Sequence, residues 1–81
     1  MNREEILEKV IDIVSDKLSI EKEEIFDNSN LVKDLNADSL DAIDITMTIE
    51  AEFDISIPDE EAERLLTVDL LTNYIERKLN V

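Results

Sequence analysis

The sequence predicts an all-α protein: a four-helix bundle with three longer helices, one short helix and a long first loop. Apolar residues recur at the three- and four-residue spacing of a helix face in residues 3–18, 39–52 and 68–79. Each of these segments begins beside a residue that caps helices well. The chain has 81 residues, 43% of them hydrophobic, which allows one modest core. We therefore expect a single domain over residues 1–81.

The first helix is expected from about Arg3 to Leu18. Asn2 is a suitable N-cap, and Glu5 follows three residues later, as in a capping box. The residues expected to face the core lie on one stripe, widened on its flanks by Ile6 and Ile13: Leu7, Val10, Ile11, Val14 and Leu18.

Residues 19–37 show no sustained period and form an unusually long connection for so small a domain. A short helical turn is expected near Glu21–Ile25. Asp27 opens a turn, but the glycine and spaced ligands of a calcium loop are missing, so we expect no metal site. Because the chain has no glycine, Asn or Asp must occupy positions with positive φ, and Asn36 is a candidate. The residues expected to anchor this loop to the core are Ile25, Phe26, Leu31 and Leu35.

The second helix is expected from about Ser39 to Glu52, and it carries two apolar stripes. Ile45, Ile49 and Phe53, with Ala42, are expected to face the core. A second stripe lies on another side, flanked by acids, and such a stripe is typical of a docking face. The alternative is a helix buried on two sides. The second stripe consists of Leu40, Ile43 and Met47, and its flanking acids are Asp41, Asp44 and Glu50.

Pro58 separates this helix from a short third one, expected over Asp59–Arg64. Thr67 then caps a last helix over about Val68–Leu79. Its expected core stripe, with Leu70 and Tyr74 beside it, is Val68, Leu71, Ile75 and Leu79.

The charge distribution narrows the class of partner. The net charge is −14, and between Lys33 and Arg64 there is no basic residue. A nucleic-acid partner is excluded, because phosphate contacts require the opposite sign. Such a stretch is often only a solvated surface, but proteins with basic patches are its natural partners. No apolar run approaches a membrane span, and the acidic N-terminus is unlike a signal peptide. We expect a cytoplasmic monomer.

The chain contains neither cysteine nor histidine. Without the usual general base, a serine nucleophile has no ordinary means of activation, and we expect no enzyme activity. Ser39 begins a predicted helix, where unpaired amides and the helix dipole favour a phosphate. The simpler alternative is that Asp38 or Ser39 only caps the helix, with Asp41 completing a capping box.

Residues 36–41, NADSLD, resemble the modification motif of acyl carrier proteins, in which the serine carries a 4′-phosphopantetheine arm. Residues 52–54 and 57–63 also resemble the family, so that the similarity covers nearly the whole chain. Asn36 stands where relatives commonly have glycine. The resemblance implies a free-standing carrier of acyl thioesters in fatty acid biosynthesis, with Ser39 modified by a phosphopantetheinyl transferase that uses coenzyme A and Mg²⁺.

The resemblance also implies two further sets of residues. Partner enzymes with basic patches would contact Asp38, Leu40, Asp41, Ile43, Asp44, Met47, Glu50, Asp59 and Glu63. An apolar cleft for the acyl chain would be lined by Ile49, Ile57, Ala62, Leu65, Leu71 and Ile75, which are also ordinary core residues. The alternatives are a carrier of a polyketide, aminoacyl or D-alanyl cargo, and an acidic helical adaptor without an arm.

Overall fold

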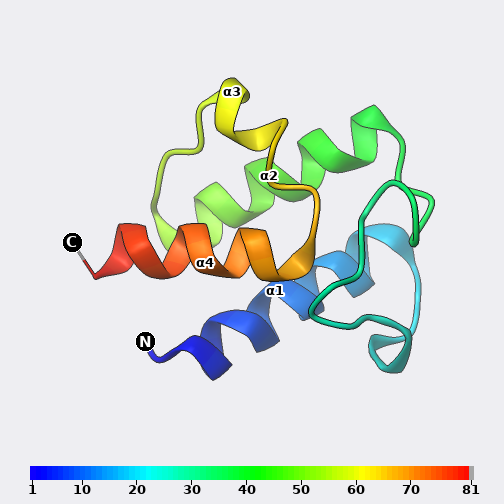
Figure 1. Cartoon of the computed structure of the whole chain (residues 1–81), viewed down its shortest axis with the longest axis horizontal. Helices are drawn as coiled ribbons and strands as arrows, with labels where there is room; N and C mark the ends of the chain where they lie inside the picture. Colours follow the sequence, from blue (N-terminus) through cyan, green and yellow to red (C-terminus); the bar gives the residue numbers. More distant parts are fainter. Residues whose placement is uncertain (81) are drawn as a thin grey trace.

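The computed structural model describes residues 1–80, which form α1 (Arg3–Leu18), the 3₁₀ turn η1 (Lys22–Glu24), α2 (Ser39–Phe53), α3 (Asp59–Ala62) and α4 (Val68–Leu79). The predicted fold class is confirmed, with three longer helices, one short helix and a long connection from α1 to α2. α1 packs against both α2 and α4. The short α3 lies beside α2 (Figure 1). None of the helices within residues 1–80 is long and apolar enough to cross a membrane.

Helix capping explains why the three longer helices begin where the sequence predicts. The Asn2 side chain accepts a hydrogen bond from the Glu5 amide at 2.9 Å, and the Glu5 carboxylate accepts from the Asn2 amide at 3.1 Å. This reciprocal pair satisfies two amides that the helix leaves unpaired. At the start of α4 the cap is a single bond, in which the Thr67 hydroxyl accepts from the Leu70 amide at 3.3 Å.

One hydrophobic core holds the described residues together, and its fully buried members come from all three longer helices. On α1 the centre of the buried face is Ile6, Val10 and Val14. The predicted stripe was therefore slightly rotated, because Ile6 belongs to its middle while Leu7 and Ile11 are only half-buried. α2 contributes Ile45, Ile49 and Phe53, and α4 contributes Val68, Leu71, Tyr74 and Ile75.

The long first connection is attached to the start of α4 by backbone hydrogen bonds. Leu31 donates to the Leu66 carbonyl at 2.8 Å, and Asp69 donates to the Asp27 carbonyl at 2.8 Å. Ile25 and Leu31 are buried as predicted. Phe26 is not an anchor: it is 63% exposed, because the turn at this point is closed by the Ser29 hydroxyl, which accepts from the Phe26 amide.

Among residues 1–80 of this glycine-free chain, three adopt positive φ. Asn36 (φ 61°) and Asp54 (φ 53°) were the expected residue types, but Ser19 (φ 55°) was not. Ser19 ends α1, where its amide donates to the Ser15 carbonyl. Two other predicted positions also differ: α3 ends at Ala62 rather than Arg64, and Leu79 in the last turn of α4 is exposed.

Candidate functional site

Ser39 is the first residue of α2 and is exposed. The cap of this helix is formed by its neighbours: the Asp38 carboxylate accepts from the Asp41 amide at 2.9 Å, and the Asp41 carboxylate accepts from the Asp38 amide at 3.2 Å. Within residues 1–80 the Ser39 hydroxyl has no hydrogen-bond partner in the protein. Asp38 and Asp41 therefore complete the cap of α2 without the Ser39 hydroxyl.

The surroundings of Ser39 fit a phosphodiester. In the described part of the chain, the amides of Ser39 and Leu40 have no protein acceptor, and both lie at the positive end of the α2 dipole. Asp38 and Asp41 oppose an additional anion, but their carboxylates are engaged with each other's amides. The first turn of α2 can therefore hold a phosphate on Ser39 through backbone donors.

The second apolar stripe of α2, which consists of Leu40, Ile43 and Met47, is exposed to solvent. Leu40 is 74% exposed, Ile43 55% and Met47 62%, whereas Ile45 and Ile49 are fully buried. Exposed side chains of this size at one-turn spacing on a small domain indicate a surface that another molecule covers. The stripe begins one residue after Ser39, so a partner that reaches the serine would meet it.

A groove of about 650 Å³ joins Ser39 to this stripe and to α3. Ile43 and Met47 line it from α2, and Asp59, Ala62 and Glu63 line it from α3 and its C-cap. Ala42, expected to face the core, is half-buried and lines the groove instead. Sequence reasoning missed three lining residues, because two lie in non-periodic segments and the third is polar: Val32, Leu66 and Thr46.

The residues predicted to line an acyl cleft divide into two groups. Ile57 and Ala62 line the groove. The other four lie in the hydrophobic core and do not reach the groove in this structure: Ile49, Leu65, Leu71 and Ile75.

Glu50 lines the groove and also binds the linker between α2 and α3. Its carboxylate accepts a hydrogen bond from the Ile57 amide at 2.8 Å, across seven residues of sequence. Ile57 is almost completely buried and directly precedes Pro58, the N-cap of α3. Glu50 therefore holds the linker that positions α3 against α2.

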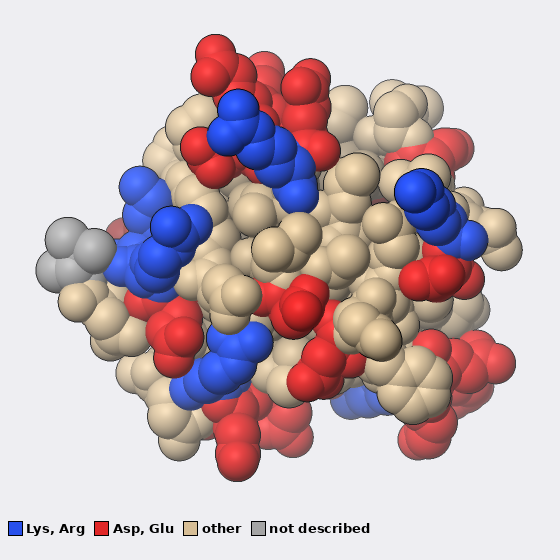
Figure 2. Space-filling view, in the orientation of Figure 1, with Lys and Arg blue, Asp and Glu red and all other residues tan. Residues whose placement is uncertain are grey.

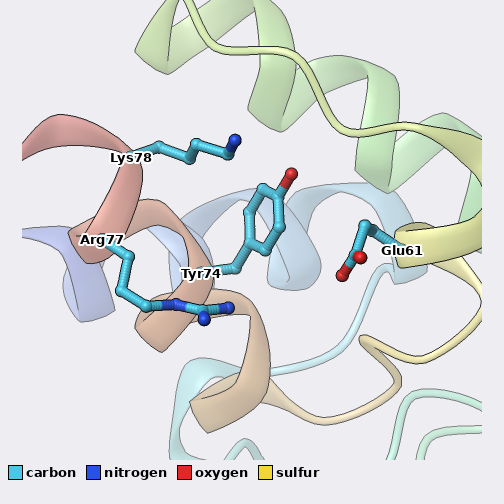
Figure 3. Close-up of a pocket in the computed structure, with 4 residues that line it drawn as sticks. All are labelled: Glu61, Tyr74, Arg77 and Lys78. Carbon is cyan, nitrogen blue, oxygen red and sulfur yellow. The ribbon is translucent and has the colours of Figure 1, made fainter. Parts of the chain in front are cut away.

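A second cavity, of about 380 Å³, is lined by Glu61 of α3 and by Tyr74, Arg77 and Lys78 of α4 (Figure 3). The C-terminal end of α4 lies away from the start of α2 (Figure 1). The aromatic wall of this cavity is the Tyr74 ring, with the Arg77 Cζ 5.7 Å and the Lys78 Nζ 5.4 Å from the ring centroid. The Tyr74 hydroxyl donates to the Ser56 carbonyl at 3.3 Å. Tyr74 thus holds the α2–α3 linker from the α4 side, as Glu50 does from α2.

Acidic side chains dominate the surface around α3 (Figure 2). Asp59 and Glu63 are exposed there. The acidic stretch has no base in its own sequence, but α1 supplies two: Lys17 lies 3.4 Å from the Asp44 carboxylate, and Lys9 lies 3.1 Å from that of Glu52. The acidic surface of α2 is therefore partly neutralised at two points.

Comparison with known proteins agrees with this geometry. The family described as "Phosphopantetheine attachment site" matches residues 8–75 of the chain. This match defines the class: a carrier protein whose prosthetic group is phosphopantetheine.

Comparison with individual proteins narrows the kind of carrier further. The chain is 48% identical over 79 residues to the acyl carrier protein of Thermosynechococcus vestitus, covering 98% of each, and 50% identical over 78 residues to that of Prochlorococcus marinus, covering 96% of this chain and 98% of the relative. The solved structure of the Enterococcus faecalis acyl carrier protein superposes with a TM-score of 0.82 at 40% identity, covering 96% of this chain and 99% of that one. The chain belongs to the acyl carrier protein family, whose members are carriers rather than enzymes.

Proposed function

We propose that this protein carries acyl intermediates of fatty acid biosynthesis as thioesters on a 4′-phosphopantetheine arm attached to Ser39. The observation that carries the proposal is the state of the Ser39 hydroxyl: it is exposed and unbonded within residues 1–80, because Asp38 and Asp41 complete the helix cap without it. When attached, the arm supplies a terminal thiol that holds the acyl group. The chain itself supplies the attachment point, a docking surface and a groove.

The other serines fit attachment less well. The Ser15 hydroxyl donates to the Ile20 carbonyl at 2.6 Å, and Ser29 is buried with its hydroxyl accepting from the Phe26 amide. Ser19 and Ser56 are exposed, but neither begins a helix. Only Ser39 combines exposure with the unpaired amides of a helix start.

We propose that a phosphopantetheinyl transferase and acyl-processing enzymes dock on α2 and α3 around Ser39. Leu40, Ile43 and Met47 would fill an apolar notch in the partner. The acids around them would steer basic patches toward it: Asp38, Asp41, Asp44, Glu50, Asp59 and Glu63. Glu50 would combine this role with its hydrogen bond to the linker.

We also propose that the groove beside Ser39 is where an acyl chain enters. Ile57 and Ala62 would meet the chain first, since they already line the groove. The buried residues of the predicted cleft would be reached only if α3 moved away from α2: Ile49, Leu65, Leu71 and Ile75. The cytoplasmic location and monomeric state expected from the sequence stay predictions.

Treatment of the apo protein with a phosphopantetheinyl transferase, Mg²⁺ and coenzyme A tests attachment directly. Intact mass should rise by one phosphopantetheine, and peptide mapping should place it on Ser39. The Ser39→Ala protein should keep its fold, judged by circular dichroism, and gain no mass. A Ser39→Ala protein that gains the arm would contradict the proposal by showing attachment at another residue. An unmodified wild type would contradict it in favour of an acidic adaptor without an arm.

A further inference from the structure

The acidic docking surface contains a cation that its own stretch of sequence does not provide. Lys17, near the end of α1, places its ammonium nitrogen 3.4 Å from the Asp44 carboxylate of α2. The Asp44 side chain is 57% exposed and the Lys17 side chain 30%, so this ion pair lies at the surface, where a partner can reach it.

Asp44 lies next to residues of α2 that line the groove beside Ser39. Ile43 precedes it and Met47 follows one turn later, and both line the groove that contains Ser39. A partner that covers the apolar stripe therefore passes over Asp44. A second ion pair, between Lys9 and Glu52 at 3.1 Å, joins the same two helices away from the groove-lining residues.

We propose that Lys17 is a specificity-determining residue of the docking surface, acting as an internal competitor for Asp44. A basic residue of an approaching protein partner has to share the Asp44 carboxylate with the Lys17 ammonium or displace it. Lys17 thus slows association with partners that present Lys or Arg at this point. It favours partners whose other contacts with the docking surface make up for the weaker attraction to Asp44. This inference rests on the proposed docking of partners around Ser39.

The Lys17–Asp44 ion pair should be weak enough for a partner to displace, yet close enough to affect the association rate. Exposed ion pairs are weak, so Lys17 can be displaced without unfolding α1. A unit charge within a few ångströms of the contact still changes the local attraction in water, and salt screens it beyond ~8 Å. Removing Lys17 should therefore raise the association rate of a basic partner by about two- to fivefold at low salt. The gain should shrink as salt is added.

The experiment measures association of apo protein with the phosphopantetheinyl transferase by stopped-flow, at low and high salt. Lys17→Gln is compared with Lys9→Gln, which removes the same charge from the same helix and also frees an acid of α2. Lys17→Gln should associate faster than Lys9→Gln at low salt, and the two should converge at high salt. Equal rates for the two variants at low salt would overturn the proposal.

A charge swap separates competition from stability. The Lys17→Asp, Asp44→Lys double variant can re-form the ion pair but leaves a cation on the docking surface. It should associate slowly, like Asp44→Lys alone, whereas a wild-type rate would overturn the proposal. Failure of the underlying function gives different results: Ser39 would gain no arm, or Asp44→Lys would associate as fast as Glu52→Lys. If Asp44→Lys is slow but Lys17→Gln matches Lys9→Gln, only the competitor role fails.

Discussion

Truncating Glu50 should loosen the linker that carries α3. In the folded protein the Glu50 carboxylate accepts from the Ile57 amide at 2.8 Å, and Ile57 is only 4% exposed. Glu50→Ala leaves this largely buried amide without an acceptor, which costs about 1–3 kcal/mol. Glu50→Gln keeps a carbonyl oxygen at the same reach but makes the bond neutral, so it should cost about 1 kcal/mol.

Comparing the two variants isolates the hydrogen bond from the charge. Both remove one anion from a chain of net charge −14, so relief of repulsion stabilises them equally. For a domain of this size, 1 kcal/mol shifts the melting temperature by roughly 4–8 °C. The two costs differ by up to about 2 kcal/mol, so we expect Glu50→Ala to melt below Glu50→Gln, by up to roughly 16 °C, as followed by circular dichroism.

Glu52 provides the control on the same helix. Its carboxylate is exposed and, in the part of the chain that the structure describes, pairs with Lys9 alone, an interaction worth about 0–1 kcal/mol, so Glu52→Ala and Glu52→Gln should melt nearly together. Hydrogen exchange at the Ile57 amide should accelerate in Glu50→Ala and not in Glu52→Ala. If Glu50→Ala and Glu50→Gln melt at the same temperature and the Ile57 amide stays protected, Glu50 does not hold the linker.

Three further predictions concern charge and packing. Asp44→Lys should slow modification of Ser39 by the transferase more than Glu52→Lys, because both lose an ion pair to α1 but only Asp44 flanks the groove; equal slowing would indicate a net-charge effect. The melting temperature should rise when NaCl or Mg²⁺ is added to a low-salt buffer, since screening relieves repulsion in a chain of net charge −14; a fall would show that the four ion pairs found within the described residues outweigh this repulsion. The Asp12 carboxylate raises the pKa of Lys22 above its ordinary 10.5, so this pair stabilises the fold below that pH and its contribution is lost as pH rises through the raised value; the melting difference between wild type and Lys22→Gln should disappear there.

Residues close in sequence were predictable. The longer helices begin directly after their N-caps, which are Asn2, Asp38 and Thr67. These starts were predictable because capping is a local interaction among four residues. The exposed and buried stripes of α2 likewise follow from helical periodicity, which assigns Leu40 and Ile45 to different sides.

Contacts between distant segments were not predictable. The first loop is held at the start of α4 by backbone hydrogen bonds, such as that from the Leu31 amide to the Leu66 carbonyl. Backbone hydrogen bonds do not depend on side-chain type, so the sequence pattern does not predict them. Phe26 was therefore misassigned to the core by hydrophobicity alone. The Lys17–Asp44 pair and the Glu50–Ile57 bond depend on how two segments pack, which charge and periodicity within each segment do not specify.

The intact mass of the protein purified from its own host decides whether Ser39 carries an acyl thioester arm. We expect a population heavier by one phosphopantetheine. Part of this population should be heavier still by acyl groups that neutral hydroxylamine removes, as expected of thioesters. Fragmentation should place the whole added mass on Ser39. A protein from growing cells that carries no added mass, or carries it on another residue, would show that Ser39 is not the attachment point.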